Sequence, residues 1–245
     1  MAVIAGGTQS ADAPALVLLH EGLGSLALWR DFPAVLASLT GRKVVVWSRY
    51  GYGRSTVVRR ARPVEYMHEE ALTVLPELLD RLAIERPVLV GHSDGASIAL
   101  IYAGSGPDHP VAGVVALAPH VVVEDRSVAG VRAARQEYLH GDLPARLARY
   151  HTDPDATFWG WNDVWLSAPF RAWNIEAYLL AVTCPVLLVQ CADDRYGSLA
   201  QLDRIEARVA GRVERLVLPE GGHAPHQSHR EEVAGRISDF VRSLA

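Results

Sequence analysis

A serine stands in a short glycine-flanked stretch, residues 91–95, which reads G-H-S-D-G. The stretch follows an apolar run directly and opens a segment with helical character, so it matches G-x-S-x-G in the strand–turn–helix context of a nucleophilic serine. Glycines are needed on both sides because side chains in so tight a turn would collide with neighbouring backbone. The start of the helix would also direct N–H groups towards developing negative charge. Ser93 is the candidate nucleophile, and the alternative is an ordinary serine in a glycine-rich turn.

A serine hydroxyl is a poor nucleophile until a base takes its proton, and that base needs a carboxylate to orient it. Two later loops supply such groups. Asp193 and Asp194 follow the apolar run 185–190, and His223 follows the run 213–218 and a pair of glycines. The order serine, acid, histidine, with each residue in a loop after a strand, is the order expected for this motif. We therefore expect His223 to be the base of an acyl-transfer site.

Three histidines, His223, His226 and His229, recur in the last loop. Such spacing is compatible with a metal site, but no matching set of carboxylates and cysteines lies nearby, so we expect no metal. His226 is expected at the mouth of a substrate pocket, and His229 is expected to be a solvated residue at the start of the last helix.

Short apolar runs alternate with segments of helical period, which predicts an α/β fold with a mostly parallel sheet and helices on both faces. Within the segments predicted as helices, apolar residues recur at the spacing of one helix face. The predicted strands are 15–19, 43–47, 87–90, 111–117, 185–189 and 213–218, and the predicted helices are 27–39, 65–82, 95–103, 199–209 and 230–244.

This alternation stops between residues 121 and 180, where helical pieces at 131–139 and 143–150 precede a cluster of aromatic residues. Four of the six tryptophans of the chain lie in that cluster. An excursion of this kind in a sheet protein predicts a helical lid rather than an independent domain. We therefore expect a core formed by residues 1–120 and 181–245 and a lid formed by residues 121–180.

The composition of the chain argues against some classes of binding partner. It has 245 residues and a formal net charge of −4, so no basic surface indicates a nucleic-acid or anionic-membrane partner. The longest apolar run, 111–123, is interrupted by Pro119 and His120 and is too short to span a bilayer. The first residues lack the pattern of a secretory signal, and a cytoplasmic location is expected. Cys184 and Cys191 bracket one extended strand and are too far apart for a mutual disulfide.

With these motifs in this order, the chain resembles the α/β-hydrolase superfamily along nearly its whole length. The motifs are H-E-G-L-G-S at 20–25, S-R-Y-G-Y-G-R-S at 48–55, the serine turn, A-D-D at 192–194 and G-G-H at 221–223. The resemblance implies that Asp194 is the acid, because 191–194 matches the G-x-x-D of relatives with cysteine at the glycine position. It also implies an oxyanion hole formed by the N–H groups of Asp94 and Gly22, with Leu23 as the alternative to Gly22. Glu21 departs from the usual glycine, and we expect it to point away from the hole, towards Arg49 or Ser25.

The predicted activity is hydrolysis of a carboxylic ester of a small apolar or aromatic substrate through an acyl-enzyme, without a cofactor. Alternatives within the fold are an acyl-CoA thioesterase and a carbon–carbon bond hydrolase of ring-cleavage products. An alternative of another class is a non-catalytic ligand-binding protein. The expected substrate contacts combine loop, strand-end and aromatic residues: Leu23, His120, Trp159, Trp161, Trp165 and His226.

Overall fold

The computed structural model describes residues 2–4 and 13–244. Within them the chain forms a seven-stranded sheet in the order β1-β3-β2-β4-β5-β6-β7. β1 runs antiparallel to β3, and every other neighbouring pair is parallel, which confirms the predicted mostly parallel sheet. The strands are β1 (Ala2–Ile4), β2 (Leu16–Leu19), β3 (Val44–Val46), β4 (Val88–His92), β5 (Gly113–Leu117), β6 (Val186–Cys191) and β7 (Val213–Leu218).

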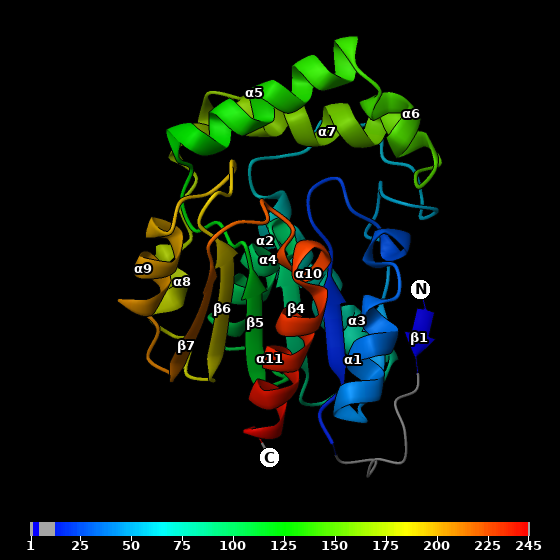
Figure 1. Cartoon of the computed structure of the whole chain (residues 1–245). Coiled ribbons are helices and arrows are strands. Elements are labelled where there is room, and N and C mark those ends of the chain that lie inside the picture. The colour runs from blue at the N-terminus through cyan, green and yellow to red at the C-terminus, as the bar shows by residue number, and fades with distance from the viewer. Residues whose placement is uncertain (1, 5–12, 245) are drawn as a thin grey trace.

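The central strands are continuous apolar runs because both of their faces are covered. Every residue of β2 to β6 is buried. One face packs on α1 (Phe32–Thr40) and α11 (Arg230–Arg242), which lie side by side in front of the sheet (Figure 1). The helices that cover the opposite face are α2 (Tyr66–Glu69), α3 (Leu75–Arg81), α4 (Asp94–Ala103), α8 (Glu176–Leu179) and α9 (Ala200–Glu206).

Two of the predicted helices are divided in the structure. The segment predicted as one helix over 27–39 is a 3₁₀ turn, Leu26–Trp29, followed by α1. Arg30 adopts a left-handed φ of 54° between them, which an uninterrupted helix does not allow. In the segment predicted over 65–82, a π-helical turn, Glu70–Val74, joins α2 to α3. The short α10 (Pro225–Ser228) precedes α11.

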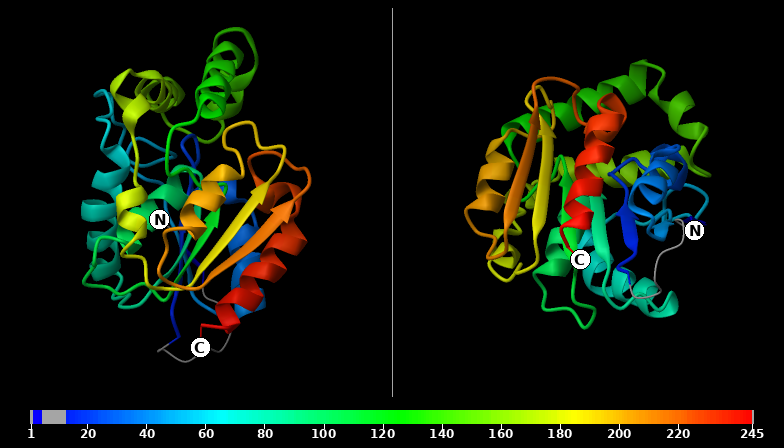
Figure 2. Two further views of the ribbon diagram at one scale, coloured as in Figure 1. Left: turned by 90° about the vertical axis from the view of Figure 1, so that its left-hand side faces the viewer. Right: turned by 60° about the horizontal axis from the view of Figure 1, so that its bottom comes forward.

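Within residues 121–180, α5 (Asp125–His140), α6 (Leu143–Ala148) and α7 (Pro154–Leu166) lie above the carboxyl ends of the strands (Figure 1), whereas α8 packs on the sheet. Figure 2 shows α5, α6 and α7 as a layer of their own, clear of the sheet. The two ends of this excursion meet. Val122 and Asn174 form an antiparallel bridge, and the N–H of Ile175 donates to the carbonyl of Val121 at 2.9 Å. That this layer acts as a lid stays a prediction.

Both cysteines, Cys184 and Cys191, are unpaired. In the part of the chain that the structure describes, no helix combines the length and the apolarity needed to cross a membrane.

Candidate active site

Ser93 lies at the sharp turn between β4 and α4, with φ of 53° and ψ of −117°. The geometry explains both flanking glycines. A Cβ added to Gly91 would lie 2.3 Å from the carbonyl oxygen of Gly95, and one added to Gly95 would lie 2.0 Å from the carbonyl oxygen of Leu19. Neither residue can carry a side chain unless the backbone moves, so the turn holds Ser93 in a strained but fixed position.

Ser93, His223 and Asp194 are joined in one line of hydrogen bonds. Nε2 of His223 lies 2.9 Å from Oγ of Ser93, and Nδ1 lies 2.8 Å and 3.0 Å from the two carboxylate oxygens of Asp194. The carboxylate holds the proton on Nδ1, so Nε2 is left to accept the proton of the serine hydroxyl. The three groups come from the loops after β4, β6 and β7, which meet at the carboxyl edge of the sheet.

The Asp194 side chain is fully buried and held on both oxygens. The N–H of Tyr196 donates to Oδ1 at 2.8 Å, and the amide of Gln190 donates to Oδ2 at 3.3 Å. Burial alone would raise the pKa of Asp194, but the hydrogen bond and charge of His223 and the Tyr196 N–H bring the pKa below its ordinary value. Asp194 is therefore a carboxylate at neutral pH.

The neighbouring Asp193 binds the backbone of the loop that carries His223. Its carboxylate accepts from the N–H groups of Gly221 and Gly222 at 3.2 Å and 2.8 Å. Both glycines have positive φ, at 129° and 71°. Asp193 thus fixes the turn that delivers His223.

Gly22 and Leu23 lie in the loop after β2 and face Ser93 across a small cavity that the Asp94 residue also lines. The indole of Trp161 covers Gly22 so closely that a Cβ there would lie 2.2 Å from Nε1. The loop is held from behind by the buried Arg49. The N–H of Arg49 donates to Nε2 of His20 at 3.1 Å, and its guanidinium donates to the carbonyl of Glu21 at 3.0 Å. The structure therefore brings together the groups predicted to form an oxyanion hole.

Glu21 does not point to Arg49 or Ser25, which corrects that expectation. Its Oε2 lies 3.4 Å from Nδ1 of His92, and Nε2 of His92 donates to the carbonyl of His223 at 2.7 Å. Burial alone would lower the pKa of His92, but Glu21 and the His223 carbonyl raise it above its ordinary value. Burial would likewise raise the pKa of Glu21, and His92 brings it well below its ordinary value. Both shifts favour the charged forms of Glu21 and His92, and the hydrogen bond of His92 supports the backbone of His223.

The cavity above Ser93 has a volume of about 140 Å³. Four of the predicted substrate contacts line it: Leu23, His120, Trp161 and Trp165. Four further lining residues were not predicted from the sequence: Glu21, Ser127, Val131 and Tyr196. Tyr196 could have been proposed from the sequence, since it follows Asp194 by two residues. In the structure its ring centre lies 4.7 Å from that of His223.

Trp159 and His226 do not line this cavity, and their predicted substrate contacts are corrected. Trp159 lies on another side of α7, where its ring meets Tyr138 and the guanidinium of Arg135. His226 is buried behind the site, between Trp29 and Phe32.

The three histidines of the last loop also have separate surroundings. His223 faces Ser93, and His226 lies between Trp29 and Phe32. Nδ1 of His229 lies 3.1 Å from Oγ of Ser228. Among residues 2–4 and 13–244, no group of three or more His, Cys, Asp and Glu side chains is arranged to hold a metal.

His120 is buried against Trp165 and His223, with ring-centre distances of 5.3 Å and 5.7 Å. Burial, followed by the charge of His223, lowers the pKa of His120 to about 3. The imidazole of His120 is therefore uncharged at neutral pH. Its Nδ1 has no hydrogen-bond partner in the described part of the chain.

The Asp94 carboxylate is buried beneath the cavity. Tyr66 donates to its Oδ2 at 2.6 Å, and Nε1 of Trp165 donates to the Tyr66 hydroxyl at 3.0 Å. Burial raises the pKa of Asp94, and the nearby Arg49 and the Tyr66 hydrogen bond partly oppose this. Through these bonds Trp165 is tied to the turn that carries Ser93.

A family model described as the alpha/beta hydrolase family matches residues 16–236. The chain belongs to this family. The match covers every strand but β1, and it includes all three residues of the hydrogen-bonded line.

Individual relatives are distant. This α/β-hydrolase is 29% identical over 250 residues to human serine hydrolase BPHL, with 96% of this chain and 81% of the relative covered. It is 32% identical over 94 residues to the proline iminopeptidase of Lactobacillus helveticus, with 38% of this chain covered. That alignment spans only 32% of the iminopeptidase's own length. Among solved structures, proline iminopeptidase from Mycobacterium smegmatis superposes with a TM-score of 0.80 at 20% identity, with 99% and 94% of the two chains covered. This last likeness concerns the fold.

Proposed function

We propose that this α/β-hydrolase is a serine hydrolase that cleaves carboxylic esters of small apolar or aromatic substrates. The observation that carries the proposal is the unbroken line of hydrogen bonds from Ser93 Oγ through His223 to Asp194, at 2.9 Å and 2.8 Å. A serine in an isolated glycine-rich turn needs neither contact. The name of the human relative, a serine hydrolase, supports the same class of reaction.

The proposed reaction proceeds in two halves. His223 takes the proton of Ser93 as Oγ attacks the ester carbonyl, and the resulting imidazolium returns that proton to the leaving alcohol. Water then attacks the acyl-enzyme, with His223 again as base, and releases the acid and free Ser93. The N–H groups of Gly22 and Asp94 would stabilise the negative oxygen in both halves, and such a donor is typically worth about 10²–10³ in turnover.

The proposed substrate follows from the size and lining of the cavity. The Leu23, Val131, Trp161 and Trp165 side chains form an apolar wall around Ser93. Such walls bind apolar or aromatic groups, and the few polar groups fix their orientation. A space of about 140 Å³ accommodates only a short acyl group.

The test is an ester panel on the full chain. We expect hydrolysis of p-nitrophenyl acetate and butyrate, loss of turnover by at least about 10³-fold in Ser93→Ala, and an unchanged rate in Ser105→Ala, an exposed serine after the same helix. A fluorophosphonate should label wild type and Ser105→Ala but not Ser93→Ala. Preferential turnover of an acyl-CoA or of a ring-cleavage dienoate would move the assignment to those activities. Ligand binding without labelling or turnover would leave only a binding protein.

A further inference from the structure

The cavity above Ser93 is too small for a whole ligand of ordinary size. Sites for small organic ligands occupy about 300–1,000 Å³, whereas this cavity has about 140 Å³. Part of any larger substrate must therefore lie outside it. An adjoining space shares a wall with the cavity.

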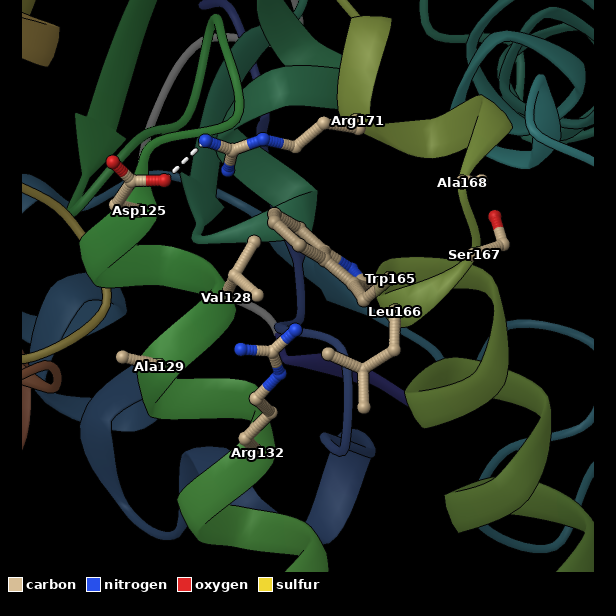
Figure 3. A pocket seen from close by; sticks show the side chains of 9 residues that line it. All are labelled: Asp125, Val128, Ala129, Arg132, Trp165, Leu166, Ser167, Ala168 and Arg171. Atoms are coloured by element: carbon tan, nitrogen blue, oxygen red, sulfur yellow. Dashed lines mark hydrogen bonds and ion pairs between the residues drawn. The ribbon is translucent and has the colours of Figure 1, made fainter.

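That space is a groove of about 470 Å³ between α5 and the end of α7 (Figure 3). Trp165 lines both spaces, and α5 contributes to both from neighbouring positions. Ser127 and Val131 face the cavity, and Val128 and Arg132 face the groove. The groove alone, at about 470 Å³, lies within the usual range for ligand sites.

The groove has an apolar floor and a cationic rim. Val128, Leu166 and the Trp165 indole lie at its centre, and the guanidinium groups of Arg132 and Arg171 enter it from opposite sides (Figure 3). Arg171 forms an ion pair with Asp125, whereas Arg132 forms none with the other residues that line the groove. One positive charge is thus left over beside apolar surface.

We propose that this groove is the outer part of the substrate site and that it binds a carboxylate at the end of the substrate remote from the scissile bond. The apolar linker of such an ester would lie along Trp165, and its carboxylate would meet Arg132, with Arg171 beside it. The groove thereby favours esters with a terminal carboxylate over neutral esters of the same length.

The arrangement at Trp165 fixes the side chain that the two spaces share. Its Nε1 donates to the Tyr66 hydroxyl, which in turn donates to Asp94 beside the nucleophile. The indole is therefore held as a common wall rather than as a free flap. This inference rests on the proposed ester hydrolysis, because it assigns the substrate class of that same site.

The test compares two matched series of p-nitrophenyl esters on the full chain. In one series the acyl chain ends in a carboxylate, and in the other it ends in a methyl group at equal length. The variants are Arg132→Gln, which removes the free cation, and Ala129→Trp, which fills the groove from an exposed position on α5. The matched control is Arg135→Gln on the same helix, whose guanidinium lies over Trp159 and does not line the groove.

We expect wild type to prefer the carboxylate series in kcat/KM by about threefold to fivefold at the chain lengths that reach the groove, which is the range of an exposed ion pair. Arg132→Gln should lose this preference, and Arg135→Gln should keep it. Ala129→Trp should slow the long esters of both series far more than it slows p-nitrophenyl acetate.

Two results would overturn the proposal and leave ester hydrolysis standing. One is equal kcat/KM for the two series at every length, and the other is normal turnover of long esters by Ala129→Trp. In both cases acetate hydrolysis and labelling of Ser93 would persist. Absence of both acetate hydrolysis and Ser93 labelling would instead refute the proposed function, and the groove assignment with it.

Discussion

The charged pair between Glu21 and His92 should make a measurable, pH-dependent contribution to stability. Glu21→Gln removes the charge and keeps the shape of the side chain. The side chains are 23% and 3% exposed, so water screens the pair only partly. Hydrogen bonds to charged groups contribute about 1.5–3 kcal/mol, and the 3.4 Å separation places this one at the weak end, about 1–2 kcal/mol. For a chain of this length we expect Tm to fall by about 2–8 °C.

The sign of the pH dependence follows from the two pKa shifts. His92 has a raised pKa, so its contribution is fully present below the ordinary histidine value and is lost as the pH rises through its folded pKa. Glu21 has a lowered pKa, so its contribution is lost only as the pH falls through that low value. The pair should therefore stabilise the fold at pH 6 and much less at pH 9.

The assay is urea unfolding of wild type, Glu21→Gln, His92→Gln and the double variant at both pH values. We expect a coupling energy of about 1–2 kcal/mol at pH 6 that shrinks at pH 9. The control is Glu77→Gln, which breaks an exposed pair with Arg81 and should change stability by less than about 0.5 kcal/mol. A coupling energy near zero at pH 6, or one equal at the two pH values, would refute the assignment of a charged pair.

Three further predictions concern the line of hydrogen bonds and its supporting turn. Asp194→Asn should lower kcat for an active ester by about 10⁴-fold, because the amide favours the wrong His223 tautomer; circular dichroism would check the fold, and a loss below tenfold would contradict the role. Gly95→Ala should destabilise the protein by about 3 kcal/mol or more, because the new Cβ meets the Leu19 carbonyl at 2.0 Å, whereas Gly235→Ala on α11 has open space and should be tolerated. Equal unfolding midpoints for these two variants would disprove the steric argument. Finally, the Asp194 carboxylate, whose pKa is lowered by His223 and by the Tyr196 N–H, should stay charged at mildly acid pH; a pKa of Asp194 above its ordinary value in a carboxyl-carbon NMR titration would contradict this.

The sheet could be predicted because strands buried on both faces are continuous apolar runs, as at 16–19, 44–46 and 186–191. The positions of Ser93 and Asp194 follow from the same pattern, since each lies in the loop after such a run, whereas His223 follows β7, most of whose residues are only half-buried. The break at Arg30 could not be predicted, because one residue in a left-handed conformation leaves no trace in an amphipathic sequence.

The aromatic segment contains tryptophans that the sequence analysis did not separate into those that line the cavity and those that do not. Trp161 and Trp165 are four residues apart and share a face of α7, whereas Trp159 lies off that face. Helical spacing could therefore have separated the two cavity tryptophans from the third. The pairing of Glu21 with His92 had no such signal, since it joins residues 71 positions apart through tertiary packing alone.

The bridge between Val122 and Asn174 has a consequence for how such a chain can diversify. Because the polypeptide departs and returns at adjacent points, α5, α6 and α7 form a cassette whose replacement need not disturb the path of any strand. Ser93, His223 and Asp194 all lie in loops outside the segment that contains α5, α6 and α7. Mutations at Trp161 and Trp165 can thus change the lining of the cavity on one stretch of sequence. Ser93, Asp194 and His223, which lie on other stretches, are unaffected by such changes.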